Sequence, residues 1–544
     1  MFILILFVAL FVFWVFCYVL QPAIPQGTVG KLGFFAYLRD VWMTLTSSII
    51  VFFDVKYAID TTSQKPTVGY LVNRRAMILK DPYHIASLFD SITSSNLNNL
   101  KPFPEIQARF LDVLGLSLIT VDISDWSHMR ARTMRFLSGN YLNHYEEIMK
   151  EVMRNDILPS WIHHAAGGKA LDVYKSMLTF GGKAVIMSFM DVPAEEVPDD
   201  IATTLNNLFD VVREATYSIL PIPKWVPTPL NRRYAEKMGV MIKTVERYLE
   251  KFKKSKSLFG NIIRTHTKRC KVNWEDLHAF IVSQHVEASD EALDKARDYY
   301  LAHHKDDLFN LVSQLISLLG AKKSDQLQAD IESFLCESGT INRKLVYQET
   351  IGDMIGGSES TIVFMTMACY AMAINPDVQS QLRTYLMENK HVTLNDKINN
   401  GLLGNVLNET LRVFPPVPVT NRYITEPVTI RNKEGEEITI DPSYVPWMCT
   451  IKVHKDPSAW EDPERFNPAR WLKPPVPGSF FPFGKGPRIC LGINYAKRET
   501  AIAVSTMVEN FNIALADPNY RVQSDGNLTL RPREPVMLRL SLIS

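Results

Sequence analysis

One short segment near the C-terminus restricts what this chain can fold into more than any other feature. Residues 480–496 read FFPFGKGPRICLGINYA. At average residue frequencies, the five-point pattern F-x-x-G-x-R-x-C-x-G would arise by accident in on the order of one chain of this length in ten thousand. The pattern predicts a specific binding loop, and it is made by Phe483, Gly486, Arg488, Cys490 and Gly492.

The chemistry of this loop centres on Cys490. Its glycines permit tight turns and a close approach of the backbone to a flat cofactor, and the apolar run after Cys490 predicts the start of a helix. Backbone N–H groups and the helix dipole at such an N-terminus stabilise a negative sulfur. We therefore expect the pKa of the Cys490 thiol to be lowered. Arg488 supplies a fixed cation that suits an acidic group of the cofactor.

A phosphate-binding loop is the alternative interpretation of this glycine-rich segment. Residues 478–485 have one residue too many for G-x-x-x-x-G-K-[ST], and Gly486 stands where Ser or Thr should be. The spacing therefore disfavours phosphate as the ligand.

The charge balance and the cysteines narrow the class of protein. Lys plus Arg number 59 against 58 for Asp plus Glu, so no basic excess favours a nucleic acid partner. The six cysteines form no CxxC pair and no short-spaced framework of the disulfide or zinc type. These counts predict a chain in a reducing compartment, without nucleic acid.

The first twenty residues predict a membrane anchor. Residues 1–20 carry no charged side chain and no proline, and about 20 apolar residues in a helix span one hydrocarbon core. A cleaved signal peptide would need a basic start and a shorter apolar core. Lys31 and Arg39 follow the span, which favours a cytosolic location for the rest of the chain.

The remaining chain divides into a membrane-proximal part and a catalytic body. Residues 21–65 begin with a hinge rich in Pro and Gly, and they hold a second apolar stretch at 41–53 that is either a core helix or a surface-lying membrane contact. In the body, residues 66–544, strands come first and helices then dominate from Asp81 to Val413. Short strands follow, and the charged stretch around 253–307 is expected to be a solvated insertion.

Residues 480–496 resemble the haem-binding loop of the cytochrome P450 family, in particular its microsomal, fungal members. The resemblance implies a mainly helical fold with a small β-rich lobe. It also implies a haem b whose iron takes Cys490 as its axial thiolate ligand. The other motif residues of the loop, Phe483, Gly486, Arg488 and Gly492, would contact the same cofactor.

Further motifs of that family occur earlier in the chain, in the family's order. Trp126 and Arg130 match its W-x-x-x-R, and they would bond a haem propionate, as would Arg422. Glu409 and Arg412 match its E-x-x-R; three residues apart on a helix, they share one face.

In this family a third residue, in a P-x-R-[FW] element, completes a structural network with the Glu and Arg of E-x-x-R. Two strings of this chain can match that element. The string PERF at 463–466 is one match, but the register of Asp462 to Pro468 instead aligns PARW with the family element. Arg470 would then close a structural triad with Glu409 and Arg412, and lock the core around the haem pocket.

The expected oxygen-binding side lies in residues 351–376, where two glycines interrupt an apolar helix. Mid-helix glycines cost roughly 1 kcal/mol each relative to Ala, so a packing or functional reason is expected. The string GGSEST resembles the family element that makes room for dioxygen and relays protons. Glu359 would be the acid of this relay, and the hydroxyl of either Ser360 or Thr361 would deliver the proton.

The resemblance implies a membrane-bound monooxygenase that inserts one atom of dioxygen into a lipophilic small molecule. Electrons would come from NADPH through a separate cytochrome P450 reductase, docking near Lys485, Lys497 and Arg498. The enzyme would be single-pass in the endoplasmic reticulum membrane, with the catalytic domain facing the cytosol. A haem-thiolate isomerase or dehydratase of peroxides and a non-catalytic membrane haem carrier remain alternatives.

The sequence does not identify the substrate. A fatty acid, terpenoid, sterol or polyketide fits the membrane tether and the many aromatic residues, and the resemblance to fungal members hints at secondary metabolism. Selectivity would be set by three loops, at residues 97–120, 219–230 and 417–423.

Overall fold

The computed structural model describes most of the chain after residue 65. The described residues are 66–71, 74–91, 100–101, 117–118, 123–198, 200–217, 226–249, 251–252, 255–268, 272–284, 286, 288–304, 308–321, 325–336, 340–524 and 529–543. The expected anchor at 1–20, the segment at 21–65, and most of the loops at 97–120 and 219–230 lie outside these residues.

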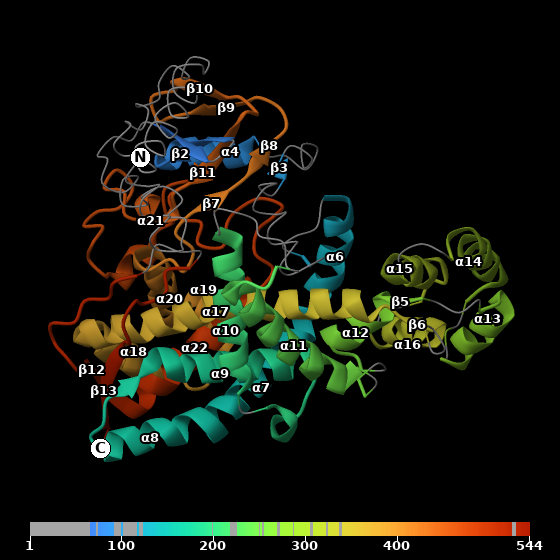
Figure 1. Cartoon of the computed structure of the whole chain (residues 1–544), viewed down its shortest axis with the longest axis horizontal. Coiled ribbons are helices and arrows are strands. Elements are labelled where there is room, and N and C mark those ends of the chain that lie inside the picture. Colours follow the sequence, from blue (N-terminus) through green and yellow to red (C-terminus); the bar gives the residue numbers. More distant parts are fainter. Residues whose placement is uncertain are drawn as a thin grey trace.

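A long buried helix, α17 (Arg343–Ile374), runs through the centre of the molecule (Figure 1). Asn342 caps its first turn, accepting a hydrogen bond from the N–H of Leu345. Two other helices pack against it, α9 (Val173–Met190) and α22 (Ile493–Asn510). All three contribute buried side chains to the largest apolar core of the described residues, so α17 is held on several sides by packed side chains.

The remaining helices of the body lie around this centre or in the β-rich lobe. They are α4 (Pro82–Asp90), α6 (Ile123–Phe136), α7 (Gly139–Val152), α8 (Leu158–Ala166), α10 (Ile201–Tyr217), α11 (Pro229–Leu249), α12 (Leu258–Thr265), α18 (Pro376–Glu388), α19 (Leu394–Asn400), α20 (Leu402–Val413) and α21 (Thr450–Val453). A π-helical turn (Met153–Ile157) joins α7 to α8, and short 3-10 helices cover Ala194–Glu196 and Pro468–Leu472.

The strands form small sheets, as expected. The sheet of order β1-β2-β11-β7 contains β1 (Thr67–Leu71), β2 (Arg74–Leu79), β11 (Tyr444–Met448) and β7 (Thr420–Asn421). Three further sheets of the body pair β9 (Val428–Arg431) with β10 (Glu437–Ile440), β3 (Leu100–Lys101) with β8 (Tyr423–Ile424), and β12 (Phe511–Leu515) with β13 (Met537–Leu542), which in turn pairs with β4 (Leu171–Asp172).

The first of these sheets joins strands that are far apart in the sequence. Strands β1 and β2 pair antiparallel, with Thr67 opposite Ile78, whereas β11 runs parallel to β2, with Tyr444 opposite Arg75. This lobe has its own apolar core, to which α4 contributes, and it lies above α17 in Figure 1. The fold is thus mainly helical with a small β-rich lobe.

The charged stretch around 253–307 differs from the solvated insertion expected. Its first part, α12, is buried in the main core. Its later part belongs to a helical module of four elements: α13 (Trp274–Ser283), α14 (Asp290–His303), α15 (Leu308–Leu318) and α16 (Asp325–Cys336). These helices enclose a separate core. Apolar residues at helical spacing, such as Leu277 and Ile281, lie among the charges, so local charge density hid the core.

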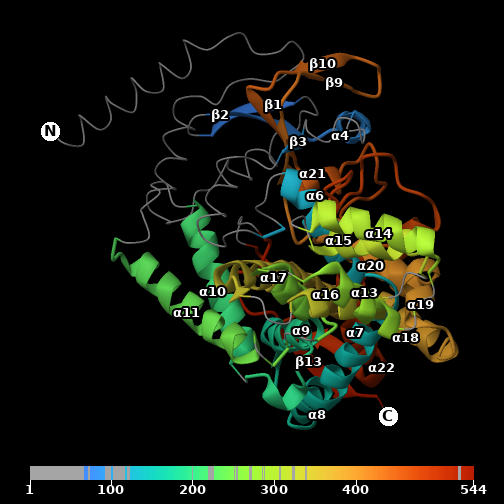
Figure 2. The same cartoon turned by 90° about the vertical axis from the view of Figure 1, so that its right-hand side faces the viewer.

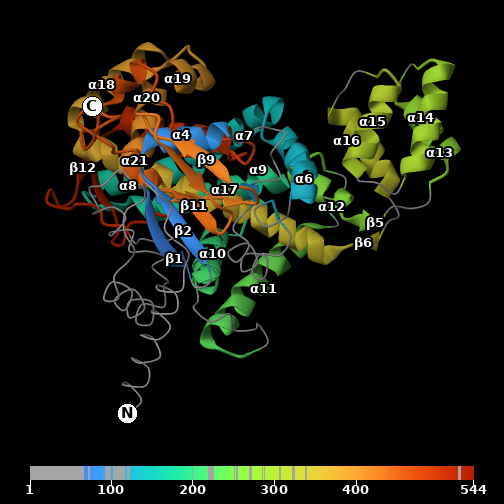
Figure 3. The ribbon, with the colours of Figure 1, turned by 90° about the horizontal axis from the view of Figure 1, so that it is seen from above.

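A narrow neck joins this module to the body. Strands β5 (Thr267–Lys268) and β6 (Thr340–Ile341) pair antiparallel at its base. Figure 3 shows the module standing apart from the body beyond α12, and in Figure 2 it faces the viewer. The insertion is therefore an appended helical unit at the N-terminal end of α17.

Within the described residues, no single helix is both long and apolar enough to cross a membrane. The pair α17 and α18, bent by 108°, passes the same criteria of length and composition when taken together, although most of α17 is buried in the core.

Candidate functional site

A cavity of about 460 Å³ lies between α6, α17, the segment around β7 and the loop that precedes α22. Its walls are mainly apolar, with aromatic side chains such as Phe364 and Phe483. The loop contributes Cys490, and α17 contributes Gly356 and Ser360 from another wall. The structure therefore places the cysteine motif and the glycine-interrupted helix on the walls of one cavity.

The backbone of the cysteine loop is held in a tight turn. Gly484 and Gly486 have φ values of +72° and +77°, which L side chains rarely adopt. The N–H of Cys490 donates to the carbonyl of Phe483 at 3.0 Å, which closes the loop. The turn therefore fixes the direction in which the chain enters the next helix.

Helix α22 begins at Ile493, three residues after Cys490, with Gly492 as its N-cap. Leu491, between the thiol and the cap, also lines the cavity. A Cβ atom added at Gly492 would lie 3.8 Å from the Cys490 Sγ, which is ordinary van der Waals contact. The thiol therefore lies just before the N-terminus of a long buried helix, as the sequence predicts.

The expectation of a lowered pKa for Cys490 is wrong for the chain alone. Although the residue is open to the cavity, the protein encloses it on its other sides. This burial raises the pKa of the thiol, and the N–H of Gly492 and the charge of Arg130 lower it by less. The net pKa lies above the ordinary value because desolvation of a thiolate outweighs one N–H group and one nearby cation. A bound cation such as a metal ion would be needed to hold the thiolate.

Three arginines line the same cavity as Cys490. The guanidinium of Arg488 lies over the ring of Trp126, 4.4 Å from its centroid, and that of Arg130 lies 5.1 Å from the same centroid. Arg130 also donates to the carbonyl of Ile489 at 2.8 Å, which ties α6 to the cysteine loop. Trp126 is buried, so its ring fixes both cations at the cavity wall.

The third cation comes from the segment around β7. Arg422 lines the cavity and donates to the carbonyl of Asn421 at 2.7 Å. Burial lowers the pKa of Arg422 to about 10, because the charged guanidinium has lost much of its water. A carboxylate bound in the cavity would offset that cost.

This donor set fits a haem. One thiol can serve as an axial ligand, three guanidinium groups suit two propionates, and the apolar walls suit a flat macrocycle. Among the described residues, no group of three His, Cys, Asp or Glu side chains could hold a metal ion by itself.

Helix α17 presents its glycine interruption to the cavity. Gly356, Gly357, Ser360 and Thr361 all line it. A Cβ atom at Gly357 would come within 3.2 Å of Val185 on α9, so a side chain there would displace the packing. The glycines therefore serve both the close approach of α9 and an open part of the cavity along Gly356 and Ser360, which we call the α17 groove.

Glu359, the expected acid of the proton relay, is not part of the cavity wall. It is buried, does not line the cavity, and accepts hydrogen bonds from Arg531 Nε at 3.1 Å, Tyr174 at 3.3 Å and Thr529 at 3.3 Å. Arg531 in turn donates to Asp210 at 2.6 Å. Burial raises the pKa of Glu359, and the charge of Arg531 lowers it by less.

Sequence reasoning missed two residues near this helix. Arg531 has no recognisable motif, and it meets Glu359 only through the fold, 172 positions away in the chain. Asp353 lines the cavity one turn before Gly357, and its place within an apolar helix was the signal that could have identified it.

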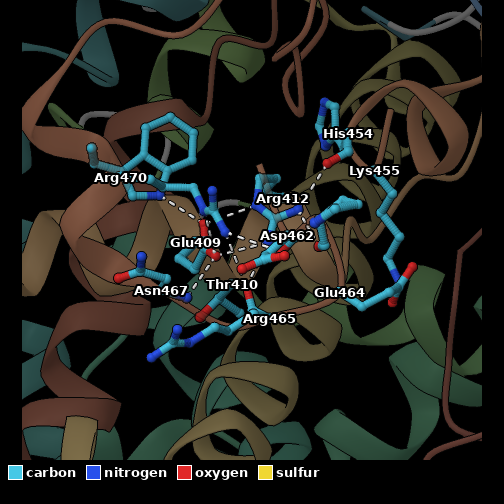
Figure 4. A network of polar contacts seen from close by, with 12 residues as sticks. Glu409, Thr410, Arg412, His454, Lys455, Asp462, Glu464, Arg465, Asn467 and Arg470 are labelled. Atoms are coloured by element: carbon cyan, nitrogen blue, oxygen red, sulfur yellow. Dashed lines mark hydrogen bonds and ion pairs between the residues drawn. The ribbon is translucent and has the colours of Figure 1, made fainter. Parts of the chain in front are cut away.

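The predicted structural triad is assembled around Arg412, whose side chain is fully buried. Its Nε and one Nη donate to the two carboxylate oxygens of Glu409, at 2.9 and 2.8 Å. The remaining N–H groups donate to the carbonyls of His454, Pro463 and Arg465. Figure 4 shows this network, in which every donor of the guanidinium has a partner.

Glu409 receives further donors from the opposite side. Arg470 Nε donates to Oε1 at 3.0 Å, the N–H of Asn467 donates to the same oxygen at 2.8 Å, and Trp471 Nε1 donates to Oε2 at 3.0 Å. Arg470 is therefore the third member in this structure. The string PERF contributes two backbone carbonyls, those of Pro463 and Arg465, to the neighbouring guanidinium groups.

His454 links this network to the cysteine loop. Its carbonyl accepts from Arg412, its Nδ1 bonds the carbonyl of Leu411 at 3.2 Å, and its Nε2 accepts from the N–H of Phe481 at 3.0 Å. Burial lowers the pKa of His454 to about 3, so the ring is neutral.

The expected docking cluster near the loop is only partly exposed. Lys485 is exposed, but Arg498 is buried and donates to Glu146 at 2.7 Å and to Asn143 at 3.0 Å. Lys497 is half-buried and donates to Asn408. The expectation of three neighbouring surface cations is therefore wrong for Arg498, which is buried against α7.

Comparisons with known proteins agree with this geometry. A family model described as "Cytochrome P450" matches residues 70–540. The chain is 22% identical over 431 residues to "Cytochrome P450 52A6" of Candida tropicalis, covering 76% of this chain and 71% of that protein.

Two further relatives match over shorter stretches. "Echinocystic acid 23-monooxygenase" of Saponaria officinalis is 31% identical over 39% of this chain and 43% of its own length. "Sterol 26-hydroxylase, mitochondrial" of Rattus norvegicus is 30% identical over 43% of this chain and 47% of its own length. The chain thus spans less than half the length of these two relatives.

Proposed function

The chain belongs to the cytochrome P450 family, and we propose that it is a haem-thiolate monooxygenase of a lipophilic small molecule. The observation that carries the proposal is the single cavity that brings together Cys490, three arginines and the interrupted helix α17. The reaction would be RH + O2 + 2 H⁺ + 2 e⁻ giving ROH + H2O, with the electrons drawn from NADPH.

The residues of the cavity divide the work of holding the cofactor. Cys490 would ligate the iron of a haem b, and Arg130, Arg422 and Arg488 would bind its propionates, with Trp126 fixing two of these cations. Bound there, a thiolate-ligated haem supplies dioxygen binding and favours O–O cleavage. The loop around it would be shaped by the remaining motif residues, Phe483, Gly486 and Gly492.

Protons would be delivered from the α17 side. Ser360 and Thr361 both line the cavity, so either hydroxyl is placed to hand on a proton. Glu359 would be the acid of this pair. Because its carboxyl group is bonded to Arg531 and Tyr174, a proton from Glu359 would pass through water or a change of rotamer.

Apolar walls and the relatives' names support a lipophilic substrate. One relative is named a hydroxylase of sterols and another a monooxygenase of echinocystic acid. A membrane-bound NADPH-cytochrome P450 reductase would supply electrons, with exposed Lys485 near the thiolate side of the cavity as one contact.

The proposed organisation follows from the sequence. Residues 1–20 would anchor the chain in the endoplasmic reticulum membrane, residues 21–65 would join the anchor to the body, and residues 66–544 would form the cytosolic catalytic domain.

Purified holoenzyme with NADPH and reductase, supplied with sterols, terpenoids and fatty acids in turn, tests this function. We expect NADPH-dependent formation of a product heavier by one oxygen atom, labelled from ¹⁸O2. Product from a hydroperoxide without NADPH, together with no NADPH-dependent turnover, would favour the peroxide isomerase. No turnover of any kind by a haem-loaded protein would favour a haem carrier.

A further inference from the structure

Asp353 is the only carboxyl group among the described residues that line the cavity. It lies on α17, one turn before Gly357. Its Oδ2 is buried and has no hydrogen-bond partner among the described residues. A buried polar atom without a partner lowers the stability of the folded protein, so we expect this carboxyl group to have a function.

A chain of titratable groups leads from Asp353 toward the surface. Glu349 lies one turn earlier on α17, is buried, and is ion-paired with Arg132 of α6. Its other oxygen meets His266 Nε2 at 2.6 Å. The side chain of His266 is 18% exposed, so this series of titratable groups reaches solvent.

The α17 groove connects Asp353 with the hydroxyl group of Ser360. Asp353, Gly356 and Ser360 share one face of the helix at spacings of three and four residues. At 1.5 Å per residue, Asp353 and Ser360 are about 10 Å apart along the axis. Gly356 is exposed and lines the cavity between them, so α17 itself places no side chain in this interval and water can occupy it.

The electrostatics of the group support a bound proton. Burial raises the pKa of Asp353 well above its usual range, the neighbouring Glu349 raises it further, and Arg132 lowers it by less. Burial also acts to raise the pKa of Glu349, but Arg132 and His266 outweigh it, so that pKa is lowered. The raised pKa favours the protonated form of Asp353, and the lowered pKa favours the ionised form of Glu349.

We infer that Asp353 is a second proton donor to the α17 groove, recharged from solvent through Glu349 and His266. The inference rests on the proposed monooxygenase function, which consumes two protons per turnover. The proton leaves the Asp353 carboxyl for water in the groove and the Ser360 hydroxyl. A solvent proton enters at His266, passes to Glu349 and restores the carboxyl, and no electron moves.

Infrared spectroscopy of the ferric holoenzyme tests this route without turnover. A protonated carboxyl has a C=O band that shifts when the group is deuterated. We expect Asp353→Asn to remove one such band. Glu499 is the matched control, because it is buried on α22, its pKa is raised well above the usual range by burial, and it does not line the cavity. Its band should persist in Asp353→Asn and disappear in Glu499→Gln.

The rate of deuteration after transfer to D2O then tests the path. In His266→Gln the Asp353 band should exchange roughly tenfold more slowly or more, while the Glu499 band keeps its rate. If Asp353→Asn fails to fold, Asp353→Glu should shift the same band. An unchanged carboxyl spectrum in Asp353→Asn, or an unchanged exchange rate in His266→Gln, overturns the inference. Absence of a haem-thiolate spectrum in the unaltered holoenzyme would instead refute the proposed function.

Discussion

Arg412 holds Glu409 by two parallel hydrogen bonds, from Nε to Oε2 at 2.9 Å and from Nη2 to Oε1 at 2.8 Å. Both side chains are fully buried. A buried ion pair is costly unless its other groups are satisfied. Here backbone carbonyls, Arg470 and Trp471 complete it, so the pair can fix the position of the segment that precedes the cysteine loop.

Removing the charge of Glu409 should therefore destabilise the protein strongly. Glu409→Gln leaves Arg412 buried without its carboxylate, and we expect a loss of about 3 to 5 kcal/mol in the free energy of unfolding. The midpoint of urea unfolding measures this. Glu464→Gln is the control, since Glu464 is 76% exposed in its pair with Lys455, and should change stability by less than about 1 kcal/mol. Equal effects of the two changes would contradict the structural role.

The helical module should depend on one buried carboxylate. Glu332 of α16 is 1% exposed, lies 3.5 Å from Arg264 of α12, and accepts from Asn261 at 2.9 Å. Glu332→Gln should cost about 3 to 5 kcal/mol, because the buried guanidinium of Arg264 loses this carboxylate as a partner.

A surface change in the same module provides the comparison. Glu291 is 79% exposed and pairs with Lys295, so Glu291→Gln should alter the free energy of unfolding by less than about 0.5 kcal/mol. Thermal unfolding of both variants measures the difference. If Glu332→Gln left the free energy of unfolding unchanged, the module would not be held to the body by this contact.

Stability should fall in acid because of His454. Its pKa is about 3 in the folded protein and about 6.5 when unfolded. The unfolded state therefore binds the proton first, so the contribution is complete above about pH 6.5 and is lost as pH falls toward 3, at up to about 1.4 kcal/mol per pH unit. His454→Gln should flatten the dependence of the unfolding midpoint on pH between about 4.5 and 6.5. An unchanged pH slope in that variant would contradict a neutral buried ring.

Short motifs predicted much of the site because their spacing is local. The order of residues around Cys490 and the three-residue spacing of Glu409 and Arg412 are fixed by a turn and a helix. The partner of Glu359 was not predictable in this way, since Arg531 meets it only after the chain has folded. The helical module was also missed, because its apolar residues are spread among many charges.

The pKa of Cys490 shows a second limit of sequence reasoning. A helix N-terminus predicts a stabilised thiolate, but the sequence does not reveal how far the surrounding protein encloses the thiol. Desolvation reverses the net direction in the chain alone. Local motifs therefore identified the candidate ligand, whereas its electrostatics depended on the tertiary structure.

The absorption spectrum of the reduced, CO-bound protein tests the central claim most directly. A haem with a thiolate ligand gives a characteristically red-shifted Soret band, and we expect this band in the unaltered protein. Cys369→Ala is the matched control, because Cys369 is buried on α17 and does not line the cavity, and it should keep the band. Cys490→Ala should abolish it, and a normal red-shifted band in Cys490→Ala would contradict the account.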